Sequence, residues 1–275
     1  MKFEMEGAHI YVPDGLDQEK GLARTTHLGI SAHQDDLEII SADGILKCFQ
    51  RQDLWFTGIV VTNGSGSPRD DLYKNYTDEE MRVVRVKEQK KAAYIGEYAA
   101  QVFLDYPSSV VKDGCSDLPV KDLVKILKIA RPRIVYTHNL ADKHDTHVAV
   151  VLKVIQAIRL LPSDERPEAF YGGEVWRDLD WMVDKDKVVF DVSAHVNLQT
   201  ALLGVFDSQI CGGKRYDLAT MGRRVAHATY FESHGTDFAT GLIYGMDMTP
   251  LVKDPMLDIS EFIQKYIDRF SQEVR

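Results

Sequence analysis

The sequence predicts an α/β fold in which a mostly parallel sheet carries helices on both faces. Short apolar runs alternate along the chain with longer segments of helical periodicity, a pattern typical of strand–helix–strand units. Polar clusters follow two of the apolar runs directly, at 31–38 and 139–147. Because ligands of open α/β sheets bind outside the carboxyl ends of the strands, we expect the functional site to be formed by these two clusters.

The individual elements follow from the same pattern. Short apolar runs bounded by turn residues predict strands at 27–30, 54–62, 102–106, 133–138, 170–176 and 188–192. Helical spacing of apolar residues predicts helices at 39–49, 82–96, 118–130, 148–161, 197–210, 216–230 and 259–270. The expected sheet is Rossmann-like, and we expect the part after Pro162 to complete it and close over the pocket.

The length of the chain is sufficient for one large α/β domain. With 275 residues a second independent domain is not required. We therefore expect a single domain over 27–275, preceded by a leader at 1–26 to which the pattern assigns no structure. We find no internal repeat and no low-complexity segment.

Composition agrees with a soluble enzyme, and the cysteine content suggests a reducing compartment. A net charge of −9 argues against a nucleic-acid partner, whose phosphates require a basic surface. The cysteines, Cys48, Cys115 and Cys211, are scattered and odd in number, which argues against a disulfide framework and a cysteine-based zinc site. The chain has no run of about 18 apolar residues, so the sequence predicts no membrane span. We expect a cytoplasmic protein; its oligomeric state, a homo-oligomer included, stays open.

The first polar cluster contains a histidine and two adjacent carboxylates in a strand-to-helix turn. His33, Asp35 and Asp36 follow the apolar run 27–30 and precede the first predicted helix. Neighbouring side chains point in different directions, so His33 and Asp36 can converge on a metal while Asp35 faces the water that the metal holds. Taken alone, the Asp pair is equally well explained as a helix cap with a favourable first-turn charge.

The second cluster repeats this arrangement after the strand predicted at 133–138. It contains His138, His144 and His147 together with Asp142 and Asp145. A catalytic zinc site typically takes three protein ligands and leaves the next position open. His33, Asp36 and one histidine of this cluster satisfy that count. His144 and His147 lie three residues apart on one helix face, so one of them can bind the metal while the other points into the site.

These residues resemble the signatures of a known family. The segment 32–38 resembles the Ala-His-Pro-Asp-Asp-Glu motif of the PIG-L/LmbE family of zinc-dependent N-deacetylases, and the segment 144–147 resembles its His-Pro-Asp-His motif. Two supporting marks are similar as well, the Arg85-x-x-Glu88 helix that ends near Gly96 and the pair Ser208-Gln209. The resemblance spans roughly 27–235.

The resemblance implies a role for each residue of the two motifs. His33, Asp36 and His147 become ligands of Zn²⁺ or another divalent metal, Asp35 the general base, and His144 the group that stabilises the oxyanion. The implied reaction is removal of an N-acetyl group from an N-acetylglucosamine-type amino sugar by attack of zinc-bound water. Asp35 takes the water proton and returns it to the leaving amine.

The chain departs from the family motifs at several positions. Gln34 replaces the usual proline, and Leu37 replaces a glutamate that occurs one place later as Glu38. Thr146 stands where the family has the aspartate that orients the oxyanion histidine, and Ser108 stands where many relatives have an aspartate that holds the sugar.

Because of these changes, other functions stay open. We expect Asp142, or else Asp145, to accept the ring proton of His144 in place of the missing aspartate. The alternatives to an amino-sugar deacetylase are a hydrolase of another small amide and a catalytically weakened family member that binds a metal or a sugar without hydrolysis.

Overall fold

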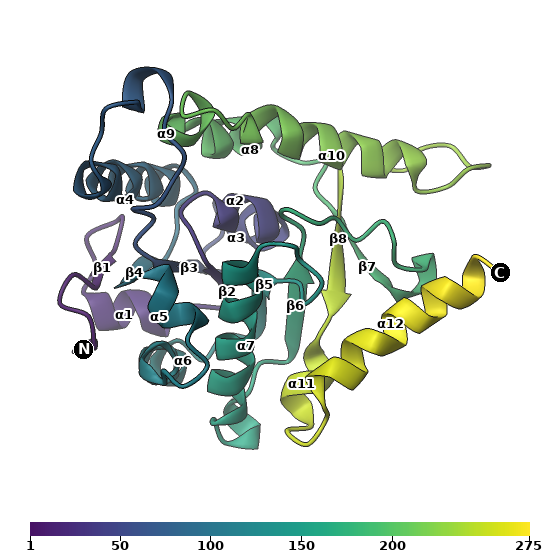
Figure 1. Cartoon of the computed structure of the whole chain (residues 1–275), viewed down its shortest axis with the longest axis horizontal. Helices are drawn as coiled ribbons and strands as arrows, with labels where there is room; N and C mark the ends of the chain where they lie inside the picture. Colours follow the sequence, from purple (N-terminus) through teal and green to yellow (C-terminus); the bar gives the residue numbers. More distant parts are fainter.

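The computed structural model describes all residues 1–275 and contains one eight-stranded sheet. The strands lie in the order β1-β4-β3-β2-β5-β6-β8-β7 (Figure 1). Their bounds are β1 His9–Tyr11, β2 His27–Ser31, β3 Phe56–Thr62, β4 Ala100–Tyr106, β5 Ile134–His138, β6 Ala169–Gly173, β7 Lys187–Asp191 and β8 Leu242–Asp247. The central strands from β4 to β6 are parallel to one another, whereas the pairs β1/β4, β6/β8 and β7/β8 are antiparallel. The predicted α/β class and mostly parallel sheet are confirmed.

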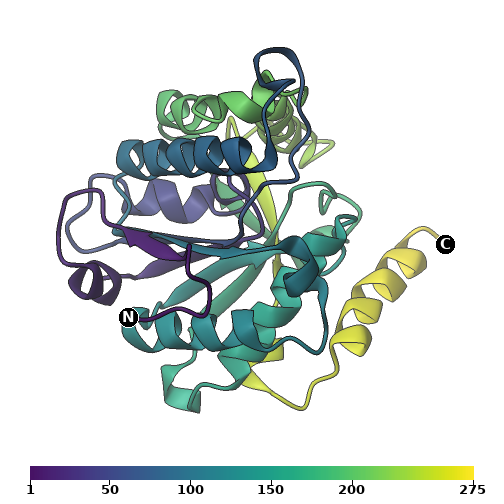
Figure 2. The same cartoon turned by 60° about the vertical axis from the view of Figure 1, so that its left-hand side comes forward.

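Helices cover both faces of this sheet. The bounds are α1 Gln18–Ala23, α2 Asp36–Ile40, α3 Ala42–Cys48, α4 Asp78–Ile95, α5 Ser108–Lys112, α6 Leu118–Ala130, α7 Asp145–Arg159, α8 Val196–Gly204, α9 Asp207–Ile210, α10 Tyr216–Tyr230, α11 Thr249–Lys253 and α12 Ile259–Glu273. Helices α4, α8 and α10 lie on one side of the sheet and α6 and α7 on the other, as both views show (Figure 1, Figure 2). No helix combines the length and the apolar character that crossing a bilayer requires.

Several elements differ from the prediction. The helix expected at 39–49 is two short helices, α2 and α3, which meet at Ser41, and α2 begins at Asp36 inside the first polar cluster. The helix expected at 197–210 is likewise divided into α8 and α9. Strand β8 lies in a segment to which the pattern assigned no element, and it pairs between β6 and β7. Within 1–26, strand β1 adds to the sheet edge beside β4.

The strand order explains why the two polar clusters meet. Strand β2 pairs in parallel with β3 on one side and with β5 on the other, so the chain order reverses direction at β2. Such a switch point in an open α/β sheet opens a crevice outside the carboxyl ends of the strands. The turn 32–35 follows β2 and the turn 139–144 follows β5. Both clusters therefore emerge at the same edge, from adjacent strands.

The close contact between β6 and α2 generates a stability prediction. A Cβ atom at Gly173 would lie 2.9 Å from the carbonyl oxygen of Ile40 and 3.0 Å from its Cα atom. Because these are backbone atoms, we expect Gly173→Ala to lower the free energy of unfolding by about 1–3 kcal/mol, measured by urea denaturation. Gly222→Ala is the matched control. Gly222 is exposed on α10 with no atom near its added Cβ, so this change is expected to stabilise by about 0.4–1 kcal/mol. A Gly173→Ala protein as stable as the wild type would contradict the described packing.

Candidate metal and active site

The turn after β2 is closed by its own aspartate. The backbone N–H of His33 donates to Asp36 Oδ2 at 2.8 Å. Asp35, between them, has a φ of 91°, a conformation that a residue with a side chain seldom adopts. Its backbone N–H donates to Gln89 Oε1 of α4 at 3.3 Å, so the neighbouring helix helps to hold the strained turn. Strain of this kind persists only where surrounding contacts enforce it, and it is common at functional sites.

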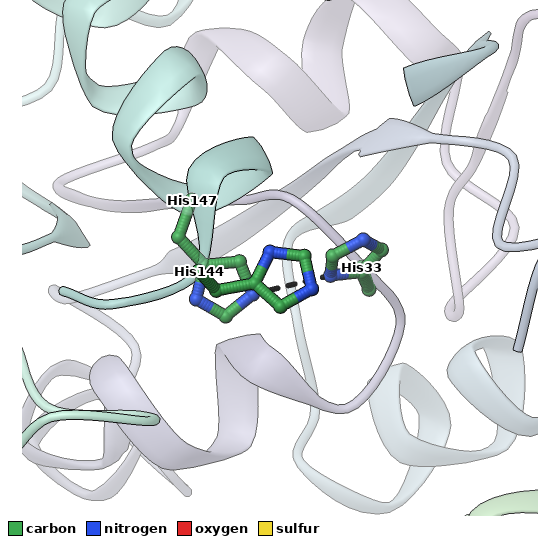
Figure 3. Close-up of side chains that lie close together, drawn as sticks. All are labelled: His33, His144 and His147. Carbon is green, nitrogen blue, oxygen red and sulfur yellow. Dashed lines mark hydrogen bonds between the residues drawn. The ribbon is translucent and has the colours of Figure 1, made fainter. Parts of the chain in front are cut away.

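Three candidate ligand atoms from the two turns form a close triangle. His33 Nδ1 lies 3.2 Å from Asp36 Oδ2 and 3.2 Å from His147 Nε2, and His147 Nε2 lies 3.3 Å from the same oxygen of Asp36. The rings of His33 and His147 approach each other from opposite sides, with the ring of His144 alongside (Figure 3). His33 and Asp36 come from the turn after β2, and His147 from the first turn of α7.

The spacing of this triangle fits a zinc ion. Zinc bonds to nitrogen and oxygen of about 2.0–2.1 Å in a tetrahedral site place neighbouring ligand atoms about 3.3–3.4 Å apart. The three distances of 3.2–3.3 Å are close to that value. Two imidazoles and one carboxylate are also a donor set typical of catalytic zinc sites. The donor chemistry and the geometry of the residues therefore fit the metal that the sequence resemblance implies.

Two other histidines lie near enough to be considered as ligands. Potential ligand atoms of His33, His144 and His147 lie within 4.8 Å of one another, and so do those of Asp36, His138 and His147. His138 Nε2, however, accepts a hydrogen bond from the backbone N–H of Ala32 at 2.8 Å and is already engaged. His144 makes no hydrogen bond to the triangle and contributes a ring stacked on His147, with centroids 4.5 Å apart.

Asp142 contacts a different histidine from the one expected. Its Oδ2 atom lies 3.3 Å from Nδ1 of His147, on the opposite side of that ring from the triangle. The ring nitrogen Nδ1 of His144 is buried and has no hydrogen-bond partner. The exposed Asp145 pairs with Lys112 at 3.6 Å. The prediction that Asp142 or Asp145 accepts the ring proton of His144 is therefore wrong, because one carboxylate turns toward His147 and the other toward solvent.

The charges around the triangle favour a cation. Burial by itself would lower the pKa of His147, but Asp36 and Asp142 on its two sides outweigh burial and raise the pKa to about 9. Burial would likewise raise the pKa of Asp36, yet the neighbouring histidines hold it well below its usual range. For His33, burial dominates and lowers the pKa. Two buried carboxylates thus face one imidazole, an arrangement that attracts positive charge.

Asp35 is a buried carboxylate beside the triangle. Burial raises its pKa well above the usual range, although Arg85 opposes the shift. The Arg85 guanidinium lies 3.3 Å from Asp35 Oδ1 and also donates to the Gln34 carbonyl and the Ser67 hydroxyl. A raised pKa brings a carboxyl group closer to the range in which it can both take and return a proton.

The two supporting motifs, Arg85-x-x-Glu88 and Ser208-Gln209, stabilise the turn after β2 through contacts from other elements. Arg85 of α4 holds the turn directly, as described above. Glu88, one turn further along α4, accepts hydrogen bonds from the backbone N–H of Ser208 at 2.7 Å and from its hydroxyl at 2.6 Å. This places Gln209 in the pocket wall. The side chain of Gln34, where the family has proline, lies buried against Thr62 and Asn63.

A pocket of about 650 Å³ opens over the site. Its wall includes His33, Asp35, Asp36, Arg85, His144, Asp145, Thr146 and Gln209, the loop 62–68, the segment 107–109 with Lys112, and Trp176, Lys214 and Tyr216. Trp176 and Tyr216 are its two large apolar side chains; all the other lining is polar, charged or formed by small residues and proline. Ser108 and Thr146, two of the departures from the family pattern, both line this pocket.

The sequence pattern did not indicate Trp176, Lys214 or Tyr216. Trp176 follows β6, and the other two lie between α9 and α10 or at the start of α10, far along the chain from both motifs. The Trp176 ring lies 6.1 Å from the ring of His144 and 6.1 Å from that of Tyr216, while the Lys214 ammonium lies 5.0 Å from the Trp176 ring. An aromatic residue shortly after a strand is the one available signal, and it is too common to be specific.

Comparisons with known proteins bear on the family and the fold. The chain resembles N,N'-diacetylchitobiose deacetylase from Pyrococcus horikoshii, with a TM-score of 0.64 and 15% identity over 91% of this chain and 93% of that one. A conserved protein from Thermus thermophilus gives 0.60 and 19%, over 79% and 93%. GalB, the 4-carboxy-2-hydroxymuconate hydratase from Pseudomonas putida, gives 0.60 and 15%, over 82% and 96%.

At these identities the solved structures show a shared fold. The family assignment comes from the sequence itself, because residues 28–158 match the family model of PIG-L, described as GlcNAc-PI de-N-acetylase. This segment contains both turns of the site. The chain therefore carries a domain of the PIG-L family over residues 28–158, which confirms the resemblance found in its two motifs.

Proposed function

We propose that this protein is a zinc-dependent N-deacetylase of an N-acetylglucosamine-type amino sugar. The observation that carries the proposal is the triangle of His33, Asp36 and His147, with the buried carboxylate of Asp35 next to it. The PIG-L family and the fold of a diacetylchitobiose deacetylase support the same reaction class. Another divalent metal would serve the same donor set, since availability as well as affinity decides which metal a site holds.

His33, Asp36 and His147 would hold the metal. When bound, Zn²⁺ supplies Lewis acidity, which lowers the pKa of water and polarises the amide carbonyl. The three side chains are held in place by their own surroundings. Asp36 accepts the His33 backbone N–H, and His147 has Asp142 behind its ring.

Asp35 would act as the proton carrier of the reaction. As general base its carboxylate takes the proton of the attacking water, and as general acid it then gives that proton to the departing amine nitrogen. Its burial and its contact with Arg85 suit this double use, because burial favours the protonated form and Arg85 favours the ionised form. Gln89 holds the Asp35 backbone, which limits the directions in which the carboxylate can point.

His144 would donate a hydrogen bond to the carbonyl oxygen as negative charge develops there. Its ring lies in the pocket wall, 5.2 Å from the ring of His33. A donor placed in advance at this position stabilises the tetrahedral species more than the substrate. Removing one such donor typically lowers kcat about 100- to 1,000-fold.

The lining of the pocket suits a sugar substrate. Hydroxyl, amide and charged side chains dominate the wall, and they match the many hydroxyl groups of an amino sugar. Trp176 and Tyr216 offer the apolar faces on which sugar rings pack. The fold by itself does not select this reaction, because a hydratase shares it. The argument for hydrolysis therefore depends on the metal triangle and Asp35.

The proposal predicts release of acetate by the zinc-loaded protein. We expect acetate from at least one member of a panel of N-acetylated amino sugars, including N-acetylglucosamine and diacetylchitobiose. Asp35→Asn is expected to keep its zinc and lose about 100- to 10,000-fold in kcat, because the amide has nearly the same size but cannot carry the proton. Acetate is measured by a coupled enzymatic assay and zinc by atomic emission.

Three results would contradict parts of this assignment. Zinc-loaded wild type that binds these sugars but releases no acetate would indicate a binding protein, and release from other small amides alone would indicate a different substrate class. Near-normal turnover by Asp35→Asn would show that Asp35 is not the base.

A second prediction separates the metal ligands from the neighbouring histidine. His147→Gln is expected to lower zinc affinity by roughly 100-fold or more, because it removes one corner of the triangle. His144→Gln is the matched control, since it is expected to keep one zinc per chain while its kcat falls about 100-fold or more. Zinc affinity is measured by competition with a chromogenic chelator. Loss of zinc in His144→Gln with retention in His147→Gln would contradict the ligand set.

A further inference from the structure

The carboxylate of Asp142 is buried between three groups that belong to different parts of the site. The residue follows β5, and its side chain has no exposed surface. Oδ2 lies 3.3 Å from Nδ1 of His147 and accepts the backbone N–H of Trp176, also at 3.3 Å. Oδ1 accepts the backbone N–H of His144 at 3.2 Å. One carboxylate therefore contacts a proposed metal ligand, the beginning of α7 and the pocket wall.

These contacts connect segments that are far apart along the chain. His144 and His147 lie at the start of α7, whereas Trp176 lies in the loop that follows β6. The Trp176 side chain lines the pocket, and its ring lies 6.1 Å from that of His144. A shift of the His147 ring would therefore move the acceptor on which the Trp176 backbone depends, and a shift of the Trp176 loop would remove one of the donors around Asp142.

We propose that Asp142 is a positioning residue that couples the metal ligand His147 to the substrate wall at Trp176. This inference rests on the proposed metal site and adds to it a link between metal binding and the shape of the pocket. Asp142 accepts the Nδ1–H of His147, which directs Nε2 of that ring toward the triangle. The same oxygen accepts the Trp176 backbone N–H. The position of Trp176 in the pocket wall therefore depends on the position of the metal ligand His147.

The accounting of hydrogen bonds explains why a carboxylate is required. Three N–H groups converge on Asp142, and a carboxylate has acceptor sites for all of them. The amide of asparagine has one oxygen and one NH₂ group. Placing the oxygen toward His147 and Trp176 would turn the NH₂ group against the His144 backbone N–H, and the reverse orientation would turn it against the other two donors. Either orientation leaves at least one buried N–H without an acceptor.

The test uses zinc affinity and the environment of Trp176, neither of which requires turnover. In a background with Trp55→Phe and Trp181→Phe, Trp176 is the one remaining tryptophan. We expect Asp142→Asn to lower zinc affinity about 10- to 100-fold. We also expect the rate of acrylamide quenching of Trp176 fluorescence to rise measurably. Asp145→Asn is the matched control, because this exposed neighbour contacts Lys112 instead of His147, and both quantities should stay at the wild-type level.

A zinc titration of the unsubstituted site keeps the proposal falsifiable if Asp142→Asn does not fold. Zinc should lower the quenching rate of Trp176 in the background protein. Zinc binding would hold the His147 ring in place, and through it the Asp142 carboxylate and the Trp176 backbone. Tight zinc binding with no change at Trp176 would overturn the coupling while leaving the metal site intact. Wild-type zinc affinity in a folded Asp142→Asn would do the same. Failure of the background protein to bind zinc would overturn the metal site itself, and the proposal with it.

Discussion

The arrangement of the site depends on the carboxylate of Asp36. Its Oδ2 atom accepts the backbone N–H of His33 and lies 3.2–3.3 Å from ring nitrogens of His33 and His147. A single oxygen thus closes the turn after β2 and joins it to the helix that follows β5. This is possible because β2 and β5 are adjacent and parallel, so that their carboxyl ends meet at one edge. The strand order and the triangle of candidate ligand atoms are therefore parts of one constraint.

Helix α4 supports the strained turn through polar side chains on its inner face. Arg85 holds the Gln34 carbonyl and the Asp35 carboxylate, and Gln89 accepts the Asp35 backbone N–H. Gln89 also donates to Glu38 at 2.8 Å, as does the Tyr98 hydroxyl. Burial raises the pKa of Glu38 to about 7, so this group stands between its charged and neutral forms near neutral pH. These buried hydrogen bonds restrain the turn and tie it to α4.

The sequence predicted those features that depend on local pattern. The alternation of strands and helices and the positions of both motifs follow from periodicity and from residue types at strand ends. The division of 39–49 into α2 and α3 did not follow, because Ser41 ends the first helix through a local change of backbone direction that apolar spacing does not record. Strand β8 is also missing from the pattern, because its place depends on pairing with β6 and β7 from distant segments.

The partner of Asp142 shows the same limit within the site. Proximity along the chain suggested His144, but the side chain turns toward His147 and the Trp176 backbone. Such a direction is set by tertiary packing around the ring and is not encoded in spacing. Trp176 was not predicted as a site residue, because its place depends on the pairing of β6 with β5. This pairing puts the Trp176 loop beside the turn after β5. The proposed ligands followed from motif chemistry, whereas the groups that orient them required the folded chain.

Diffraction from zinc-loaded crystals at the zinc absorption edge tests the central claim most directly. The account predicts one anomalous peak per chain, within about 2.0–2.2 Å of His33 Nδ1, an Asp36 carboxylate oxygen and His147 Nε2. Asp142 should remain on the far side of the His147 ring. A peak bound instead by His138 or His144, or no peak between the two turns, would contradict it.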